Sequence, residues 1–204
     1  MTKQDSELRQ IKLTFIEPLL GTLAGDKEIA KEFILANNPA GDTAEEEQAH
    51  RDPRELLEKA SSIFARTADG KPMLWNYQMK GFFKDACSAL RRATVKLGEK
   101  SRELKAHKKV IDGCIFVSPR QIPLQVVGEL FWLERPVRAQ TAQGERIALL
   151  RSEAVPGGSS LICQVKILDT GLWSVLEDWL TYGKDRGLGQ WRNASYGSFE
   201  WAYA

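Results

Sequence analysis

The period of the apolar residues changes along this chain between two and about 3.6, and the order of these changes constrains the fold most strongly. In "RQIKLTF", apolar and polar residues alternate, so that Ile11, Leu13 and Phe15 lie on one side of the backbone. This alternation predicts a half-buried strand that ends at Pro18 and Gly21.

Two later segments repeat their apolar residues at helical spacing. In the first, within residues 76–97, the apolar stripe consists of Met79, Phe82, Phe83, Ala86, Leu90 and Leu97. In the second, residues 171–183, it consists of Leu172, Val175, Leu176, Trp179 and Leu180. We therefore expect two helices that each bury one side against a sheet, the second of them capped by Gly183.

Further strands are predicted after the first of these helices. Residues 108–119, 160–168 and 196–203 each predict one strand, and residues 126–158 predict a long hairpin that turns near Gln143 and Gly144. Between the opening strand and residue 76, we expect a helix over 26–38, an acidic loop over 39–50 and a helix over 52–65. Asp52 as N-cap and Pro53 at the first helical position mark the start of the last of these.

This order of elements predicts a single α+β domain over residues 1–204. Its core has the ferredoxin-like (RRM-like) β-α-β-β-α-β order. Two additions interrupt that order: a helical and acidic insert over residues 22–72, and a hairpin arm over residues 128–153.

Charge is unevenly distributed although the net charge is only +2. Residues 39–70 hold eight acidic and four basic side chains, whereas residues 71–151 hold sixteen basic and seven acidic ones. A basic middle beside an acidic insert suggests a face that binds a polyanion. A mixed, solvated surface is the alternative interpretation.

The motifs of common enzyme and metal sites are missing. His50 and His107 lie in unrelated segments without zinc-ligand spacing. "GKDRGLG" follows a predicted helix and precedes a strand, whereas nucleotide-binding loops run from strand to helix. We therefore expect no catalytic residue, metal or cofactor. The three separated cysteines, with no signal peptide and no membrane span, favour a cytoplasmic protein that has no membrane partner.

What remains is a candidate phosphate-binding surface. Lys80, Lys84 and Arg91 share one face of the first long helix, and Gly81 in the same helix suggests close approach of a ligand or another backbone. Near the C-terminus, a glycine-rich loop combines backbone N–H groups with cations and an aromatic ring that could stack on bases or pack in the core. The expected contacts of this loop and of the hairpin are Lys184, Arg186, Gly187, Gly189, Trp191, Arg192, Arg138 and Arg146.

Several blocks resemble, in their order, the RAMP superfamily, the ferredoxin-like RNA-binding proteins of CRISPR effector complexes. The opening strand followed by "PLLG" resembles the first strand of that family and its ending. "YQMKGFFKDACSALR" resembles its Lys-Gly helix start, with Lys80, Gly81 and a downstream Arg92 or Arg91. Residues 168–201 resemble its last helix, glycine-rich loop and final strand, and the hairpin corresponds by position to the thumb that backbone subunits lay across a guide RNA.

The resemblance implies a non-catalytic subunit that binds single-stranded RNA along its phosphate backbone and forms a homo-oligomer or joins a ribonucleoprotein. Similar blocks occur in small phage-encoded proteins, so a phage mimic that inhibits a CRISPR complex is one alternative. A RAMP-type endoribonuclease and a purely protein-binding module are the others. Cleavage is disfavoured because Tyr77-Gln78-Met79 replace the serine pair of the family, and because only Asp26 and Asp42 lie near its catalytic aspartate position. Neither histidine matches the nuclease branch.

Overall fold

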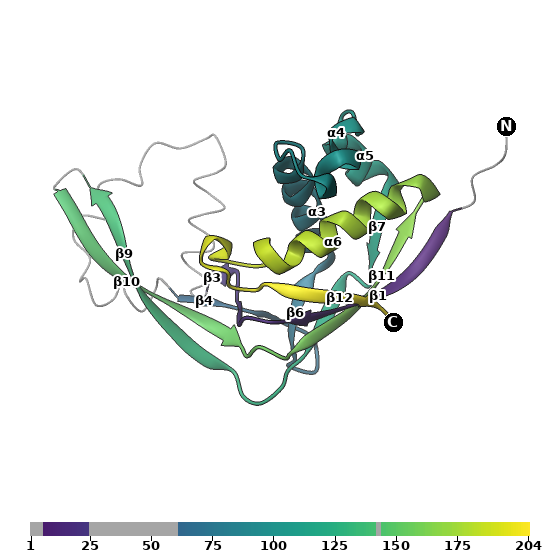
Figure 1. The fold of residues 1–204 in the computed structure, drawn as a ribbon. Coiled ribbons are helices and arrows are strands. Elements are labelled where there is room, and N and C mark those ends of the chain that lie inside the picture. Colours follow the sequence, from purple (N-terminus) through teal and green to yellow (C-terminus); the bar gives the residue numbers. More distant parts are fainter. Residues whose placement is uncertain (1–5, 25–60, 142–143) are drawn as a thin grey trace, which may run out of the picture.

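A computed structural model describes residues 6–24, 61–141 and 144–204 of the chain. At its centre, β1 (Glu7–Phe15) lies between β11 (Ser160–Ile167) and β12 (Phe199–Tyr203) and is antiparallel to both (Figure 1). β7 (Ile115–Ser118) is antiparallel to β11 on its other side, which makes the order β12-β1-β11-β7. The chain is therefore a mixed α+β protein built on an antiparallel sheet.

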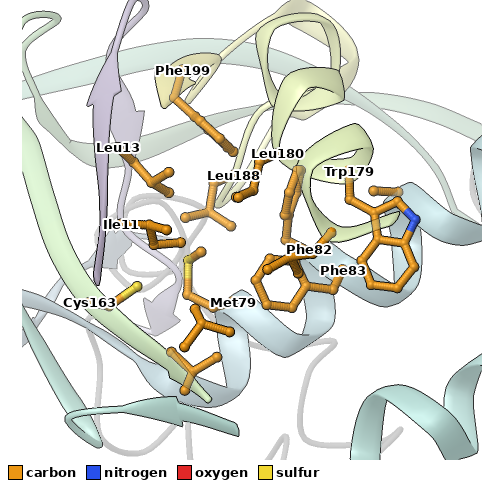
Figure 2. Packing of buried hydrophobic residues seen from close by; sticks show 14 of the residues in the cluster. Ile11, Leu13, Met79, Phe82, Phe83, Cys163, Trp179, Leu180, Leu188 and Phe199 are labelled. Carbon is orange, nitrogen blue, oxygen red and sulfur yellow. The ribbon is translucent and has the colours of Figure 1, made fainter. Parts of the chain in front are cut away.

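Two helices, α3 (Asn76–Leu90) and α6 (Trp173–Arg186), cover one face of this sheet (Figure 1). Figure 2 shows Phe82 of α3 and Trp179 of α6 in the same cluster as Ile11 of β1 and Phe199 of β12. The rings of Phe82 and Phe199 lie 5.2 Å apart, edge to face. Burying an apolar side chain of this size contributes about 1.5–3 kcal/mol, so this cluster holds the helices to the sheet.

The sheet continues beyond β11. β8 (Gln121–Gln125) pairs with β11 and with β6 (Pro72–Trp75), and β6 pairs with β5 (Ala65–Arg66). Between α3 and β7 the chain forms two short helices, α4 (Glu99–Glu103) and α5 (His107–Cys114), which pack on α3 (Figure 1).

The predicted hairpin is confirmed. It consists of β9 (Phe131–Thr141) and β10 (Gly144–Val155) and projects away from the two long helices (Figure 1). At its base, β10 also pairs with β2 (Leu19–Leu20) and β4 (Ser61–Ile63), and β4 pairs with β3 (Leu23–Ala24). The hairpin is thus held by pairing with other strands of a second sheet. Residues 142–143, at its turn, lie outside the described part.

The predicted helix over 52–65 is wrong where the structure describes it, because residues from Ser61 onward form β4 and β5. The Ser62 hydroxyl lies 2.9 Å from that of Ser152, and the N–H of Phe64 donates to the Glu153 carboxylate at 2.9 Å. Partners from a distant strand therefore override the local helical pattern. The rest of the insert, with the helix expected over 26–38 and the acidic loop over 39–50, lies outside the described residues.

The strand expected over 108–119 is only partly correct, since α5 ends at Cys114 and only Ile115–Ser118 extend. Ile111 is fully buried, and Val110 and Cys114 pack against the core beside it. Val110 and Cys114 lie four residues apart, so this short apolar group fits a helix as well as a strand. Packing of the segment against α3 favours the helix.

The helix over 171–183 is confirmed, but it does not end at Gly183. It continues to Arg186, and Gly187, with a φ of 72°, is the residue that caps it. A Cβ on Gly183 would lie 2.2 Å from the ring of Phe199, so this glycine allows α6 to pack closely against β12.

Candidate nucleic-acid interface

The glycine-rich loop between α6 and β12 is tightly folded on itself. The N–H of Leu188 donates to Gly197 and that of Gly197 to Pro18, both at 2.9 Å, and the Leu188 side chain is buried. A Cβ on Gly187 would lie 2.5 Å from the Tyr196 carbonyl oxygen, and its N–H donates to Gly183. Gly187 therefore serves the turn itself, and its N–H is already engaged.

Two arginines, one at the end of α6 and one in the middle of the loop, converge on one carboxylate of α3. Arg186 and Arg192 donate to the same oxygen of Asp85, Oδ2, at 2.7 and 2.8 Å. Arg186 also donates to Asn193 at 2.7 Å. The α3 helix and the loop are thus in contact through Asp85, a residue that sequence analysis missed.

Charge at this junction remains positive. Burial opposes ionisation of Asp85, but the hydrogen bond from Arg186 and the charges of both arginines outweigh it and hold the pKa of Asp85 below its usual value. The hydrogen bond to Asp85 in turn raises the pKa of Arg186. Two guanidinium groups against one ionised carboxylate leave one unbalanced positive charge, and all three side chains are partly exposed.

Both α5 and the segment before it pack beside the basic face of α3 and contact its cations. Lys84 forms an ion pair with Asp112 at 2.7 Å, and Lys80 donates to the Asp112 carbonyl oxygen at 3.1 Å. Arg91 donates to the carbonyl oxygen of Leu104. The hydrogen bond from Lys84 also lowers the pKa of Asp112. These cations therefore hold the helical layer in place as well as adding charge to this side of the molecule.

The glycine that follows Lys80 has no packing explanation. Gly81 is exposed, and among the described atoms none lies within 4 Å of the position that a Cβ would take. Arg92, the other arginine singled out from the sequence, is exposed just after the end of α3. The face of α3 around Gly81 is thus open to close approach from outside.

Lys184 does not join the two arginines. It lies in the last turn of α6, where it pairs with Glu200 of β12 at 3.0 Å, and both side chains are mostly exposed. Residues two apart on a helix point in different directions, which separates Lys184 from Arg186. For Arg138 of β9 and Arg146 of β10, the structure describes only the backbone, which places them on the projecting hairpin.

Trp191 lies at the surface of the loop and not in the core. It has a φ of 56° and is 37% exposed, and its ring is parallel to that of Tyr196 with centroids 5.2 Å apart. The guanidinium carbon of Arg135, from β9, lies 3.8 Å from the Trp191 ring centroid. Gly189, two residues earlier, packs closely against Leu19 and Leu20. Sequence analysis did not place Arg135 among the expected contacts, because its contact with the loop depends on the fold.

The burial of Arg135 has an electrostatic consequence. Its Nε is buried and has no hydrogen-bond partner among the described residues, and burial lowers the pKa of its guanidinium group. An unsatisfied buried donor costs about 1–3 kcal/mol, so this group would gain from an acceptor supplied by a ligand.

His107 lies 3.0 Å from the hydroxyl of Ser88, but this pair is not arranged for catalysis. The Ser88 hydroxyl donates to the Lys84 carbonyl oxygen at 2.7 Å, which directs its proton away from His107. Burial, with the charges of Arg91 and Lys108, lowers the pKa of His107. Within the described ranges, no three His, Cys, Asp or Glu side chains form a group that could hold a metal ion.

Membrane-spanning helices are not found in the described part of the chain, where every helix is too short or too polar to cross a bilayer.

Comparison with known proteins finds likeness in structure only. No family model and no curated protein matches the chain. A chain in "Cryo-EM structure of the Type III-B Cmr-beta bound to cognate target RNA" is similar over 97% of this chain and 59% of its own, with a TM-score of 0.57 and 10% identity. A chain in "Type IV-B CRISPR Complex" is similar over 97% of this chain and 90% of its own, with a TM-score of 0.49 and 11% identity. The first likeness shows a shared fold, and this chain spans 59% of that neighbour's length.

Proposed function

We propose that this chain is a RAMP-type subunit that binds single-stranded RNA along its phosphate backbone and assembles into a ribonucleoprotein. The observation that carries the proposal is the convergence of Arg186 and Arg192 on Asp85, where α3, α6 and the glycine-rich loop meet. Guanidinium groups are well suited to bind phosphate oxygens, and here they are held in place with a net positive charge.

The proposed core is the ferredoxin-like arrangement. β1 and β7 lie on either side of β11, with α3 between them in sequence, and β11 and β12 lie on either side of β1, with α6 between them. This pairing supports two interleaved β-α-β units. The fold likeness to a chain in an RNA-bound CRISPR complex agrees with this proposal.

The site as proposed extends along α3. Lys80, Lys84, Gly81 and the exposed Arg92 would extend the path of the strand away from the arginine pair, and Gly81 would let the backbone of the strand approach the helix closely. Phosphate contacts of this kind position a strand without reading its sequence. We therefore expect affinity with little sequence preference.

The hairpin arm is the proposed contact with a neighbouring subunit. Trp132 and Leu149 lie on one face of the hairpin and are 43% and 41% exposed, and Phe131, on the opposite face, is 39% exposed. Large exposed apolar side chains are typical of protein interfaces. A second copy of this chain is the occupant that a self-assembling backbone subunit would need.

The test is direct binding of a labelled single-stranded RNA to the wild type and to the double variant Arg186→Ala, Arg192→Ala. The double variant should bind at least tenfold more weakly, since it removes two phosphate contacts. Lys71→Ala is the matched control, because Lys71 pairs with Asp69 in an exposed turn away from the site. Equal RNA affinity in the wild type and the double variant would contradict the proposed site.

A further inference from the structure

The contact between the hairpin and the glycine-rich loop has features that packing alone does not explain. Trp191 adopts a left-handed backbone conformation that L-residues rarely take, and the result is an indole ring 37% exposed at the surface. Other tryptophans of this protein, Trp173 and Trp179, are buried in the core. The loop therefore presents Trp191 outward against the backbone preference of the residue.

The ring of Trp191 forms half of an aromatic platform. It lies parallel to Tyr196, with an interplanar angle of 3° and a centroid distance of 5.2 Å. At this distance parallel rings are offset, so each leaves part of its face uncovered by the other. Offset aromatic faces of this kind stack on nucleobases.

A cation lies over the Trp191 ring of this platform. Arg135 places its guanidinium carbon 3.8 Å from the Trp191 centroid, and among the described residues its buried Nε has no acceptor. Among the described side chains, no carboxylate forms an ion pair with it. Within the described part of the chain, the group therefore offers a cation without an ion-pair partner and an unbonded donor, two features that favour phosphate binding.

A similar pair on the same hairpin shows the difference. Arg151 lies 4.4 Å from the ring centroid of Trp132, but it also pairs with Glu134 at 3.6 Å and is half exposed. Its charge is thus already balanced and hydrated. The Arg135 and Trp191 pair differs from it because it joins an aromatic platform to a half-buried cation whose Nε has no acceptor among the described residues.

We propose that Trp191, Tyr196 and Arg135 form a subsite for one nucleotide of the bound strand. The base stacks on the parts of the Trp191 and Tyr196 rings that Arg135 and the neighbouring ring leave uncovered, and Arg135 binds the adjoining phosphate. The inference rests on the proposed RNA binding and deepens it, because Trp191 directly precedes Arg192 and the strand that reaches Arg192 passes this platform. It also gives the hairpin arm a direct contact with the strand.

The experiment compares two probes: a short single-stranded RNA, and a strand of equal length in which every base is replaced by an abasic ribose spacer. Trp191→Ala should bind the natural strand about fivefold to a hundredfold more weakly and the abasic strand as the wild type does. Trp191→Tyr should restore binding of the natural strand. Arg135→Ala should lose affinity for both strands, and Arg151→Ala, the matched control, should lose affinity for neither.

The outcomes separate the two levels of the proposal. If Trp191→Ala binds the natural strand like the wild type, or loses equal affinity for both strands, the base-stacking subsite is wrong while RNA binding stands. If the wild type binds neither strand, the proposed function is wrong and this inference falls with it. Thermal unfolding of each variant identifies any loss of RNA affinity that comes from misfolding. If Trp191→Ala is misfolded, the binding of the natural strand by Trp191→Tyr decides whether the base-stacking subsite is correct.

Discussion

Asp85 allows the sharpest test of how the arginine pair works. Substituting Asp85→Asn keeps the size of the side chain and one acceptor oxygen, but removes the negative charge that Arg186 and Arg192 share at 2.7 and 2.8 Å. In the proposed site this carboxylate occupies the place of a phosphate and competes with RNA. The variant should therefore bind RNA more tightly while being less stable.

The magnitudes follow from the geometry. A hydrogen bond to a charged group contributes about 1.5–3 kcal/mol, but partial exposure screens the pair, so we expect a loss of about 1–2 kcal/mol in the free energy of unfolding. For RNA, one guanidinium released from Asp85 adds up to one phosphate contact. One contact changes log affinity by about 0.7 for each tenfold change in salt concentration. The affinity of the variant relative to the wild type should therefore rise about fivefold when the salt concentration is lowered tenfold.

The assay is fluorescence anisotropy with a labelled single strand over a salt series, together with denaturant unfolding. Asp69→Asn is the control, since Asp69 lies in an exposed turn and pairs only with local groups. Weaker RNA binding by Asp85→Asn at every salt concentration would refute the reasoning. It would mean that the carboxylate is needed to orient the arginines and does not compete with the strand.

Stability should also depend on Asp85 as pH changes. The folded protein holds the pKa of this carboxyl below its usual value, so its contribution is present above the unfolded-state pKa and is lost as pH falls through the folded one. The free energy of unfolding of the wild type should therefore decrease below about pH 4, and Asp85→Asn should show a smaller decrease. Identical pH profiles would contradict this account of the ion pair.

Two further predictions concern packing and assembly. Gly183→Ala should lower the free energy of unfolding by about 1–3 kcal/mol, because its Cβ would collide with the Phe199 ring. Gly81→Ala, where a Cβ has room, should be neutral or stabilising. Denaturant unfolding measures both variants, and equal effects would contradict the packing account. Deleting residues 139–145 should leave a folded monomer that no longer assembles on RNA, so an unchanged sedimentation profile with RNA would contradict the role of the hairpin arm.

Much of the fold was predictable because its strongest periodic segments are also its most buried ones. The alternation of Ile11, Leu13 and Phe15 gave β1, and the stripes of the two long helices gave α3 and α6. The errors fall where the local pattern was short or misleading. Residues from Ser61 to Ala65 fit a helix by sequence, but bonds to Ser152 and Glu153 draw them into strands.

The candidate site was predictable in its cations but not in its organisation. Charge and glycine content singled out Arg186 and Arg192, whereas Asp85 resembles any polar residue on an exposed helix face until α6 packs beside it. Arg135 could not be identified from the sequence for the same reason, since its contact with Trp191 joins β9 to the glycine-rich loop, which is far away in sequence. The pairing of Lys184 with Glu200 depends on the position of β12, which composition does not reveal.

The salt dependence of RNA affinity tests the central proposal most directly. If Lys80, Lys84, Arg135 and the Arg186 and Arg192 pair, which has one net charge beside Asp85, each neutralise one phosphate, log affinity should fall with log salt at a slope of about −2.8 for the wild type. In the Arg186→Ala, Arg192→Ala variant, the slope should be shallower by about 0.7. A wild-type affinity that does not change with salt, or that is too weak to measure at low salt, would contradict the proposal that this surface binds the backbone of a nucleic acid.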